Sequence, residues 1–394
     1  MQGATVPAEW KTSTLGELFE FSNGVNADKS VYGEGVPFVN VLEVISNEAL
    51  TSKDIPGRIK LSSRLVARYQ VRYGDVLLNR TSETQDEVGL ASVYLGDSPV
   101  VFGGFVFRAR PKTNKLDSNY SKYALRVNSV REQIIAHGQG GIRANVGQRD
   151  MKKVRVSLPP IEEQRKIAEA LSGVDELIES VGRLIVKKQA LKQGMMQQLL
   201  AGATRVSGFT DPWMDCRLGE IARIKTGSRN SQDKESLGAY PFFVRSATVE
   251  KINSYSYDCE AILVPGEGGI GSIFHYINGK FEVHQRVYKI SHFAERVSGR
   301  FVYHYMRQFF GAHALENSVK ATVDSLRLPT FKGFELRLPA TADEQRVIAG
   351  ILDDAENEIE LLQHRLAKAR LTKAGMVQQL LTGRARLSAK ESAA

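Results

Sequence analysis

Two long segments of the chain carry apolar residues at alternating steps of four and three. In the first, these positions include Ile167, Leu171, Ile178, Met195 and Leu199, and in the second Ile348, Leu352, Ile359, Met376 and Leu380. Lys373 interrupts the second stripe. An apolar stripe sustained over about five heptads is typical of a coiled coil. Each segment is therefore expected to form one helix of about 38 residues, which corresponds to about 57 Å.

The two segments are copies of each other. Residues 163–202 match residues 344–383 without a gap, and the match is densest where each copy ends in Gln-Gln-Leu-Leu-x-Gly. Prolines precede both helices, acidic residues occupy both first turns, and Gly202 and Gly383 follow the last turns, as helix termini prefer. The chain therefore contains an internal duplication.

The duplication extends beyond the helices. Trp10 and Trp213 each precede a Leu-Gly-Glu triplet, apolar strands are expected at 76–78 and 261–264, and Leu-Pro pairs close both units at 158–159 and 338–339. We predict an α+β protein with a pseudo-two-fold internal repeat, in which two globular α/β domains are joined by two long antiparallel coiled-coil helices. The predicted boundaries are domain 1 at 1–158, central helix at 159–202, domain 2 at 203–338, C-terminal helix at 339–383 and tail at 384–394. The stripe alone does not separate pairing within one chain from pairing between two chains.

Composition narrows the class of protein only slightly. The 394 residues are 42% hydrophobic and 25% charged, which is ordinary for a globular protein, and the net charge of +9 favours an anionic partner. Cys216 and Cys259 form neither a disulfide framework nor a metal motif, which suits a reducing cytosol. No apolar run reaches the roughly 18 residues that cross a bilayer. We expect a cytoplasmic protein without a membrane partner.

The paired motifs resemble one known family. The chain repeats Leu-Pro followed by Glu-Gln-Arg-x-Ile-Ala at 158–168 and 338–349, together with the Trp…Leu-Gly-Glu starts and the Gln-Gln-Leu-Leu-x-Gly ends. In this order they resemble the specificity subunit of type I restriction–modification systems, over nearly the whole chain. One departure is Thr341-Ala342 in place of Ile161-Glu162, which makes the second helix start slightly longer.

The resemblance implies a function in sequence-specific DNA recognition. Each globular unit would be a target recognition domain that reads one half of a bipartite double-stranded DNA site, and the helices would set the gap and hold two modification subunits. Those subunits bind S-adenosylmethionine and methylate adenine, and restriction subunits with an ATP-driven motor join the complex. S-adenosylmethionine, ATP and Mg²⁺ are thus expected on the partners, and no cofactor on this chain.

Candidate DNA-binding residues lie in polar, glycine-rich segments. Residues 138–150 combine glycines with Arg, Asn and Gln, the side chains suited to guanine and adenine edges, and lysines suited to phosphates follow. The candidates are Arg80, Ser82, Arg143, Asn145, Gln148, Arg149 and Lys152 in the first domain, and Arg229, Asn230, Arg245, Arg286, Lys320 and Thr322 in the second. For each residue, an ordinary exposed polar loop is the competing interpretation.

The sequence predicts no catalytic centre. Residues 266–271 spell G-x-G-x-x-G, but an aromatic, β-branched stretch follows in place of a helix, so we expect a glycine-rich hairpin. A phosphate-binding G-x-x-x-x-G-K-[ST] loop, an Asn/Asp-Pro-Pro-aromatic methyltransferase motif and a zinc-type histidine spacing are missing. Two alternatives stay open: a scaffold for methyltransferase and motor subunits that reads DNA weakly, and a stand-alone nuclease.

Overall fold

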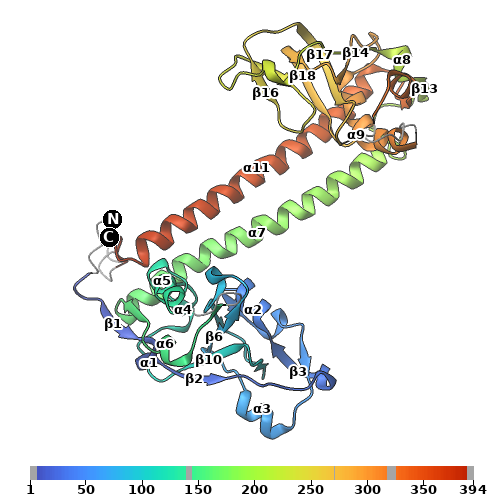
Figure 1. The fold of residues 1–394 in the computed structure, drawn as a ribbon. Coiled ribbons are helices and arrows are strands. Elements are labelled where there is room, and N and C mark those ends of the chain that lie inside the picture. The colour runs from blue at the N-terminus through green and yellow to red at the C-terminus, as the bar shows by residue number, and fades with distance from the viewer. Residues whose placement is uncertain (1–6, 139–143, 270, 317–324, 388–394) are drawn as a thin grey trace. The chain divides into compact units, whose positions relative to one another are not determined.

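The computed structural model describes residues 7–138, 144–269, 271–316 and 325–387 (Figure 1). Its internal contacts divide the chain into unit 1, Met1–Ser180 with Leu366–Ala394, and unit 2, Val181–Arg365. Both divisions fall inside the long helices, so each unit contains part of each helix. Among the described residues, no helix combines the length and apolar character needed to cross a membrane.

The two long helices form where the apolar stripes predict them. Helix α7 spans Ile161–Leu200 and α11 spans Ala342–Leu380. Every stripe residue named above is buried or half-buried. Gly202 and Gly383 have φ of +69° and +73°, the left-handed conformation that ends a helix most readily at glycine. The helix prediction is confirmed, and the stripe is the apolar face of each helix.

The helices pair within this chain, and within each unit they run antiparallel. In unit 1, the Lys373 ammonium lies 2.8 Å from the Asp175 carboxylate, and Leu380 and Leu381 share a core with Ile167 and Leu171. In unit 2, Lys188 lies 2.7 Å from Glu358 and Lys192 lies 3.0 Å from Glu356. Residue numbers rise on one helix as they fall on the other, which defines the antiparallel direction.

Unit 1 is built on a five-stranded sheet in the order β2-β10-β6-β8-β4. Smaller sheets pair β1 with β12, β7 with β11, and β3 with β5 and β9. The strands are β1 (Lys11–Thr14), β2 (Phe19–Asn23), β3 (Tyr32–Val39), β4 (Ala49–Leu50), β5 (Arg58–Ile59), β6 (Val76–Asn79), β7 (Thr81–Ser82), β8 (Ala91–Tyr94), β9 (Val101–Phe102), β10 (Val106–Pro111), β11 (Ala144–Asn145) and β12 (Arg155–Leu158). The short helices are α1 (Leu15–Leu18), α2 (Val41–Ser46), α3 (Ser63–Tyr69), α4 (Ser118–Ala124), α5 (Asn128–Ala136) and α6 (Gln148–Met151).

Unit 2 is built on a six-stranded sheet in the order β14-β19-β17-β18-β15-β16, and β13 pairs with β20. The strands are β13 (Met214–Arg217), β14 (Arg223–Thr226), β15 (Tyr240–Phe243), β16 (Glu250–Ile252), β17 (Tyr257–Pro265), β18 (His275–Val283), β19 (Val287–Ser291) and β20 (Glu335–Leu338). The helices are α8 (Leu218–Ile221), α9 (Gly299–Glu316) and α10 (Leu328–Lys332). Strands β17 and β18 pair antiparallel across the glycine-rich segment, which confirms the predicted hairpin.

The sheet cores of the two units correspond strand by strand. The antiparallel order β2-β10-β6 of unit 1 matches β14-β19-β17 of unit 2, and the pair β1-β12 matches β13-β20. Each core then continues onto the helix pair: Ile167 and Leu171 join the core of unit 1, and Ile348 and Leu352 that of unit 2. The apolar stripes therefore bury not only one helix against the other but also each helix pair against its sheet domain.

Candidate nucleic-acid interface

In unit 1, three chain segments meet where strand β6 ends. The Arg80 N–H donates to the Phe105 carbonyl at 2.8 Å, and the Val146 N–H donates to the Arg80 carbonyl at 3.1 Å. Thr81 and Asn145 then pair across β7 and β11. We call Arg80, Thr81, Phe105, Asn145 and their neighbours Asn23 and Gln148 the unit 1 rim.

Unit 2 repeats this backbone arrangement where strand β17 ends. The Gly266 N–H donates to the Arg286 carbonyl at 2.9 Å, and the Leu326 N–H donates to the Gly266 carbonyl at 2.8 Å. Glu267 and Ser325 form the corresponding bridge. Gly266 therefore stands where unit 1 has Arg80, Glu267 where it has Thr81, and Arg286 where it has Phe105. We call Glu267, Arg286 and their neighbours Asn230, Arg245 and Gln285 the unit 2 rim.

The unit 1 rim presents amide, hydroxyl and aromatic groups. The Thr81 hydroxyl donates to the Asn145 side-chain oxygen at 2.6 Å, and the Gln148 amide donates to the Asn23 side-chain oxygen at 2.9 Å. The Phe105 side chain is 63% exposed, which is unusual for a phenyl ring and places an apolar surface among these polar groups. The Arg80 guanidinium lies over the Phe107 ring, 5.7 Å from its centroid.

The unit 2 rim presents charged groups instead. The Glu267 carboxylate lies 3.3 Å from the Arg245 guanidinium and 3.2 Å from that of Arg286. Both arginines are exposed, and a guanidinium has five N–H donors, so one carboxylate orients them without using all their donors. Beside them, the Gln285 amide donates to the Asn230 side-chain oxygen at 2.6 Å.

A buried glutamine joins each long helix to its sheet domain. In unit 1, the Gln164 amide donates to the carbonyls of Lys115 and Pro159, at 2.8 and 2.9 Å, and its oxygen accepts the Asp117 N–H at 2.9 Å. Gln164 is 1% exposed. The glutamine therefore satisfies three backbone groups that have little access to water.

Unit 2 repeats the same three bonds around Gln345. Its amide donates to the carbonyls of Arg296 and Pro339, at 3.0 and 2.9 Å, and its oxygen accepts the Ser298 N–H at 2.8 Å. Gln345 is also 1% exposed. The contacts explain why glutamine occurs in both Glu-Gln-Arg motifs, which the apolar pattern does not.

The preceding glutamate binds an arginine that follows the end of the other helix. Arg386 donates to both oxygens of Glu163, at 2.6 and 2.8 Å, and Arg205 donates to both oxygens of Glu344, at 2.8 and 2.9 Å. Both carboxylates are buried, so a bidentate guanidinium is the partner that satisfies them best. The Glu-Gln-Arg motif thus anchors each helix start in a unit.

The family follows from a match over most of the chain. The model of the type I restriction modification DNA specificity domain matches twice, at residues 7–187 and 210–370, and each match covers one sheet domain with its adjoining helix. The chain belongs to this family. Its members recognise DNA sequence, which agrees with two related rims that carry different side chains.

Relatives named as specificity subunits match either nearly the whole chain or a part of it. The chain is 21% identical over 427 residues to the type I restriction enzyme MjaVIII specificity subunit of Methanocaldococcus jannaschii, covering 98% of this chain and 95% of that protein. It is 31% identical over 154 residues to the EcoDI specificity subunit of Escherichia coli, covering 39% of this chain and 33% of that protein.

Solved structures of specificity subunits share the fold. The S subunit of a type I restriction–modification system from M. genitalium matches 96% of this chain and 97% of its own, with a TM-score of 0.66 and 16% identity. The HsdS subunit from Thermoanaerobacter tengcongensis matches 98% and 99%, with a TM-score of 0.52 and 18% identity. The predicted combination of two α/β domains and two long helices is confirmed.

The candidate DNA-binding residues differ in where they lie in the structure. Arg80, Asn145, Gln148, Asn230, Arg245 and Arg286 belong to the rims. Arg149 and Lys152 are exposed on or beside α6, the helix that follows the unit 1 bridge. Arg143, Lys320 and Thr322 lie outside the described residues, in segments that lead into Ala144 and Ser325.

Two candidates have polar groups that already bind other residues inside the fold. Ser82 is 5% exposed, and its hydroxyl donates to Glu87 at 2.8 Å. Arg229 is half-buried, and its guanidinium lies 3.4 Å from the fully buried Glu282 and 3.1 Å from the Ser254 hydroxyl. The burial of Ser82 argues against a DNA contact, whereas the Arg229 side chain keeps 40% of its surface exposed and stays a candidate, as Arg245 and Arg286 do. The sequence also gave no reason to select Phe105 or Glu267.

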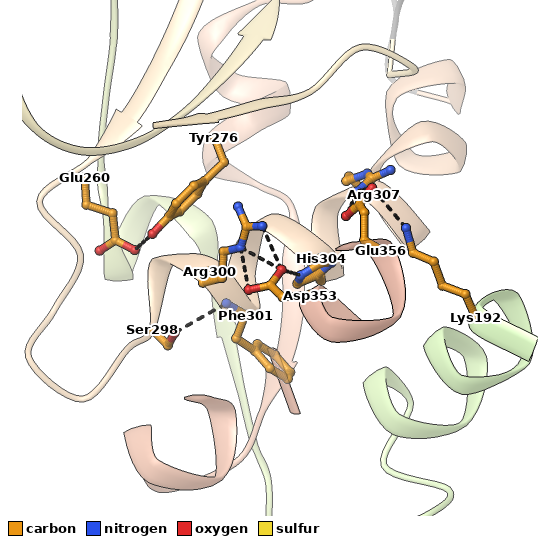
Figure 2. Close-up of polar contacts among 10 residues, drawn as sticks. All are labelled: Lys192, Glu260, Tyr276, Ser298, Arg300, Phe301, His304, Arg307, Asp353 and Glu356. Carbon is orange, nitrogen blue, oxygen red and sulfur yellow. Dashed lines mark hydrogen bonds and ion pairs between the residues drawn. The ribbon is translucent and has the colours of Figure 1, made fainter. Parts of the chain in front are cut away.

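A charged cluster in unit 2 contains the described residues best suited to hold a metal ion (Figure 2). Ligand atoms of His304, Asp353 and Glu356 lie within 4.8 Å of one another. Figure 2 shows, however, that Arg300 and His304 bind Asp353, while Arg307 and Lys192 bind Glu356. Three permanent cations already face two carboxylates, so a further divalent cation would be repelled. The cluster joins α9 to α11 and α7 rather than forming a metal site.

The pKa shifts in this cluster follow from burial and these ion pairs. Burial lowers the pKa of His304 and outweighs the opposing effect of Asp353. Burial raises the pKa of Asp353, but hydrogen bonds from Arg300 and His304 outweigh it and leave the pKa below its usual value. The pKa of Glu356 is lowered in the same way, against burial, by Arg307 and Lys192. The carboxylates are therefore ionised and His304 is neutral near pH 7.

Proposed function

We propose that this chain selects an asymmetric, bipartite DNA site, with each rim reading one half. The observation that supports this most directly is the pair of rims: the same backbone hydrogen bonds hold different side chains in the two units. A single reading surface used twice would favour a palindromic site. Two different surfaces favour two different half-sites.

We propose that α7 and α11 set the unread gap and bind two modification subunits. Both helices are continuous over about 40 residues, and a helix rises about 1.5 Å per residue. S-adenosylmethionine, ATP and Mg²⁺ would then be bound by the modification and restriction subunits, and this chain would be non-catalytic. The cluster around His304 supports the last point, because its own cations occupy the carboxylates.

The gap proposal is tested by lengthening the helices. One helical turn inserted near Lys187, with a matching turn in α11, should increase the preferred gap while both half-site sequences stay unchanged. The methylated motif of cells that express the complete system gives the measurement. An unchanged gap with an active complex would contradict the role of the helices in spacing.

Sequence recognition itself is tested by competition. With the modification subunits present, DNA that carries the methylated motif should compete far better than DNA with a scrambled motif at the same salt concentration. An assembly scaffold that reads DNA weakly would show equal competition. Metal-dependent cleavage by the isolated chain would instead indicate a nuclease.

A further inference from the structure

The two rims differ in the base chemistry that they can recognise. At the position where unit 1 exposes the Phe105 ring, unit 2 exposes the Arg286 guanidinium, and where unit 1 has the Thr81 hydroxyl, unit 2 has the Glu267 carboxylate. Backbone geometry is shared, so the difference in chemistry comes from the side chains alone. This makes a direct comparison of the two half-sites meaningful.

The unit 2 rim matches a G·C pair. Guanine presents two acceptors, O6 and N7, in the major groove, and a guanidinium is their best partner; cytosine presents an amino donor, which a carboxylate accepts. The guanidiniums of Arg245 and Arg286 lie 3.3 and 3.2 Å from the Glu267 carboxylate. Donors for guanine and an acceptor for cytosine therefore lie close together. Because these ion pairs hold the guanidiniums in place before binding, less conformational entropy is lost when DNA binds.

The unit 1 rim matches an A·T pair. Adenine presents one donor and one acceptor in the major groove, which a side-chain amide pairs with, and thymine presents a methyl group that favours apolar contact. The Gln148 amide binds the Asn23 oxygen, and this pairing leaves the Gln148 oxygen as an acceptor and the Asn23 amide as a donor. Unit 2 has a similar pair in Gln285 and Asn230, so the exposed Phe105 ring is what sets the unit 1 rim apart. Asn23 pairs with Phe107 in the sheet, two residues from the exposed Phe105 ring.

We propose that the unit 2 rim selects a G·C pair through Arg245, Arg286 and Glu267, and that the unit 1 rim selects an A·T pair through Gln148, Asn23 and Phe105. This inference rests on the proposed function, since it assigns base chemistry to half-sites that the chain must first read.

The experiment uses the complex of this chain with its modification subunits and a DNA library that is randomised in both half-sites. For the unaltered chain, methylated products should define two half-sites. Arg286→Ala should then weaken selection at a G·C position in one half-site, by roughly 5- to 150-fold, and leave the other half-site unchanged. Phe105→Ala should weaken selection at an A·T position in the other half-site only.

Matched variants separate base reading from charge and from folding. Arg286→Lys keeps the charge but loses the planar fork, so it should weaken the G·C preference less than Arg286→Ala does while keeping overall DNA affinity. Arg223→Ala removes an exposed arginine of β14 outside the rim and should change neither half-site. Thermal melting of each complex shows whether a variant has unfolded.

The outcomes distinguish the two levels of the proposal. If the unaltered complex methylates without sequence preference, the proposed function fails. If it has a bipartite motif but Arg286→Ala changes an A·T position, changes both halves, or weakens all sequences equally, the base assignment fails and the function stands.

Discussion

We call the contacts of Glu163-Gln164 and Glu344-Gln345, which join each helix start to its sheet domain, the anchors. The side chains at the anchors differ less between the two units than the side chains at the rims. At the anchors, side chains and partners both repeat: Gln164 and Gln345 make the same three bonds, and Glu163 and Glu344 bind equivalent arginines. At the rims, the backbone bonds and a Gln–Asn amide pair repeat, but Phe105 and Thr81 of unit 1 correspond to Arg286 and Glu267 of unit 2. Buried backbone groups need one particular partner, whereas an exposed position accepts many side chains without loss of stability. The difference separates residues that maintain the fold from residues free to determine what is recognised.

The largest expected effect comes from the anchors. Gln164→Ala and Gln345→Ala each remove the side-chain partner of one N–H and two carbonyls that are buried or partly buried, so each should cost about 3 kcal/mol of unfolding free energy. Chemical denaturation followed by circular dichroism measures the loss. Gln197→Ala, an exposed glutamine on α7, should change stability by less than about 0.5 kcal/mol. A large loss for one anchor only would show that the two are not equivalent.

Lys373, which interrupts the second apolar stripe, and Lys192, at the equivalent position of α7, should show smaller and unequal effects. Lys373 lies 2.8 Å from Asp175 and 2.9 Å from Glu48, so Lys373→Ala leaves Glu48 without this cation, while Asp175 keeps Lys122 at 3.1 Å. After Lys192→Ala, Glu356 still binds Arg307. We expect a loss of about 2 kcal/mol for Lys373→Ala and about 1 kcal/mol for Lys192→Ala. Equal losses in denaturation would contradict the importance of the second carboxylate.

Mild acid should affect unit 2 more than unit 1. His304 contacts Asp353, and the equivalent residue of unit 1 is Tyr123, whose hydroxyl donates to Asp175 at 2.6 Å. Because the pKa of folded His304 is lowered, the unfolded chain takes up a proton as pH falls below about 6.5 while the folded chain does not. Stability should then fall by at most about 1.4 kcal/mol per pH unit for this group.

The pH effect is measured by thermal melting between pH 7 and pH 5. His304→Tyr, which introduces the residue of unit 1, should flatten the pH dependence. Part of it should remain, because burial and two nearby arginines also lower the pKa of His284. An identical pH profile in the variant would exclude His304 as the source.

The smallest expected effect concerns the first short helix of each unit. Thr14 caps α1 by accepting the Glu17 N–H at 3.2 Å, whereas Arg217 stands at the N-cap of α8 without a side-chain cap bond. Arg217→Thr should stabilise unit 2 by about 0.5 kcal/mol, and Thr14→Ala should destabilise unit 1 by about 1 kcal/mol. Arg217→Ala serves as the control in denaturation, because it removes arginine without adding a cap.

Periodic features were predictable from sequence, and contacts between distant segments were not. The stripes, the terminal glycines and the hairpin at 266–271 depend on local spacing, so the helices and strands appear where expected. The bond from Gln164 to Lys115 joins segments far apart along the chain, which no local pattern reports. The bond of Ser82 is local, since its partner Glu87 lies five residues further along the chain, but residue type alone does not report it. Phe105 was overlooked because an isolated phenylalanine usually indicates a core.

Unit 1 is assembled from two parts of the chain, and this imposes an order in time. Its core includes both Leu15 and Leu381, and its Glu163 binds Arg386. The roughly 185 residues of Val181–Arg365 are synthesised between these two parts. At about 5 to 20 residues per second, a ribosome needs on the order of 10 to 40 s to cross that interval. Unit 2 can therefore fold before unit 1 is complete. A chain truncated before Arg386 would lack the contacts that complete unit 1.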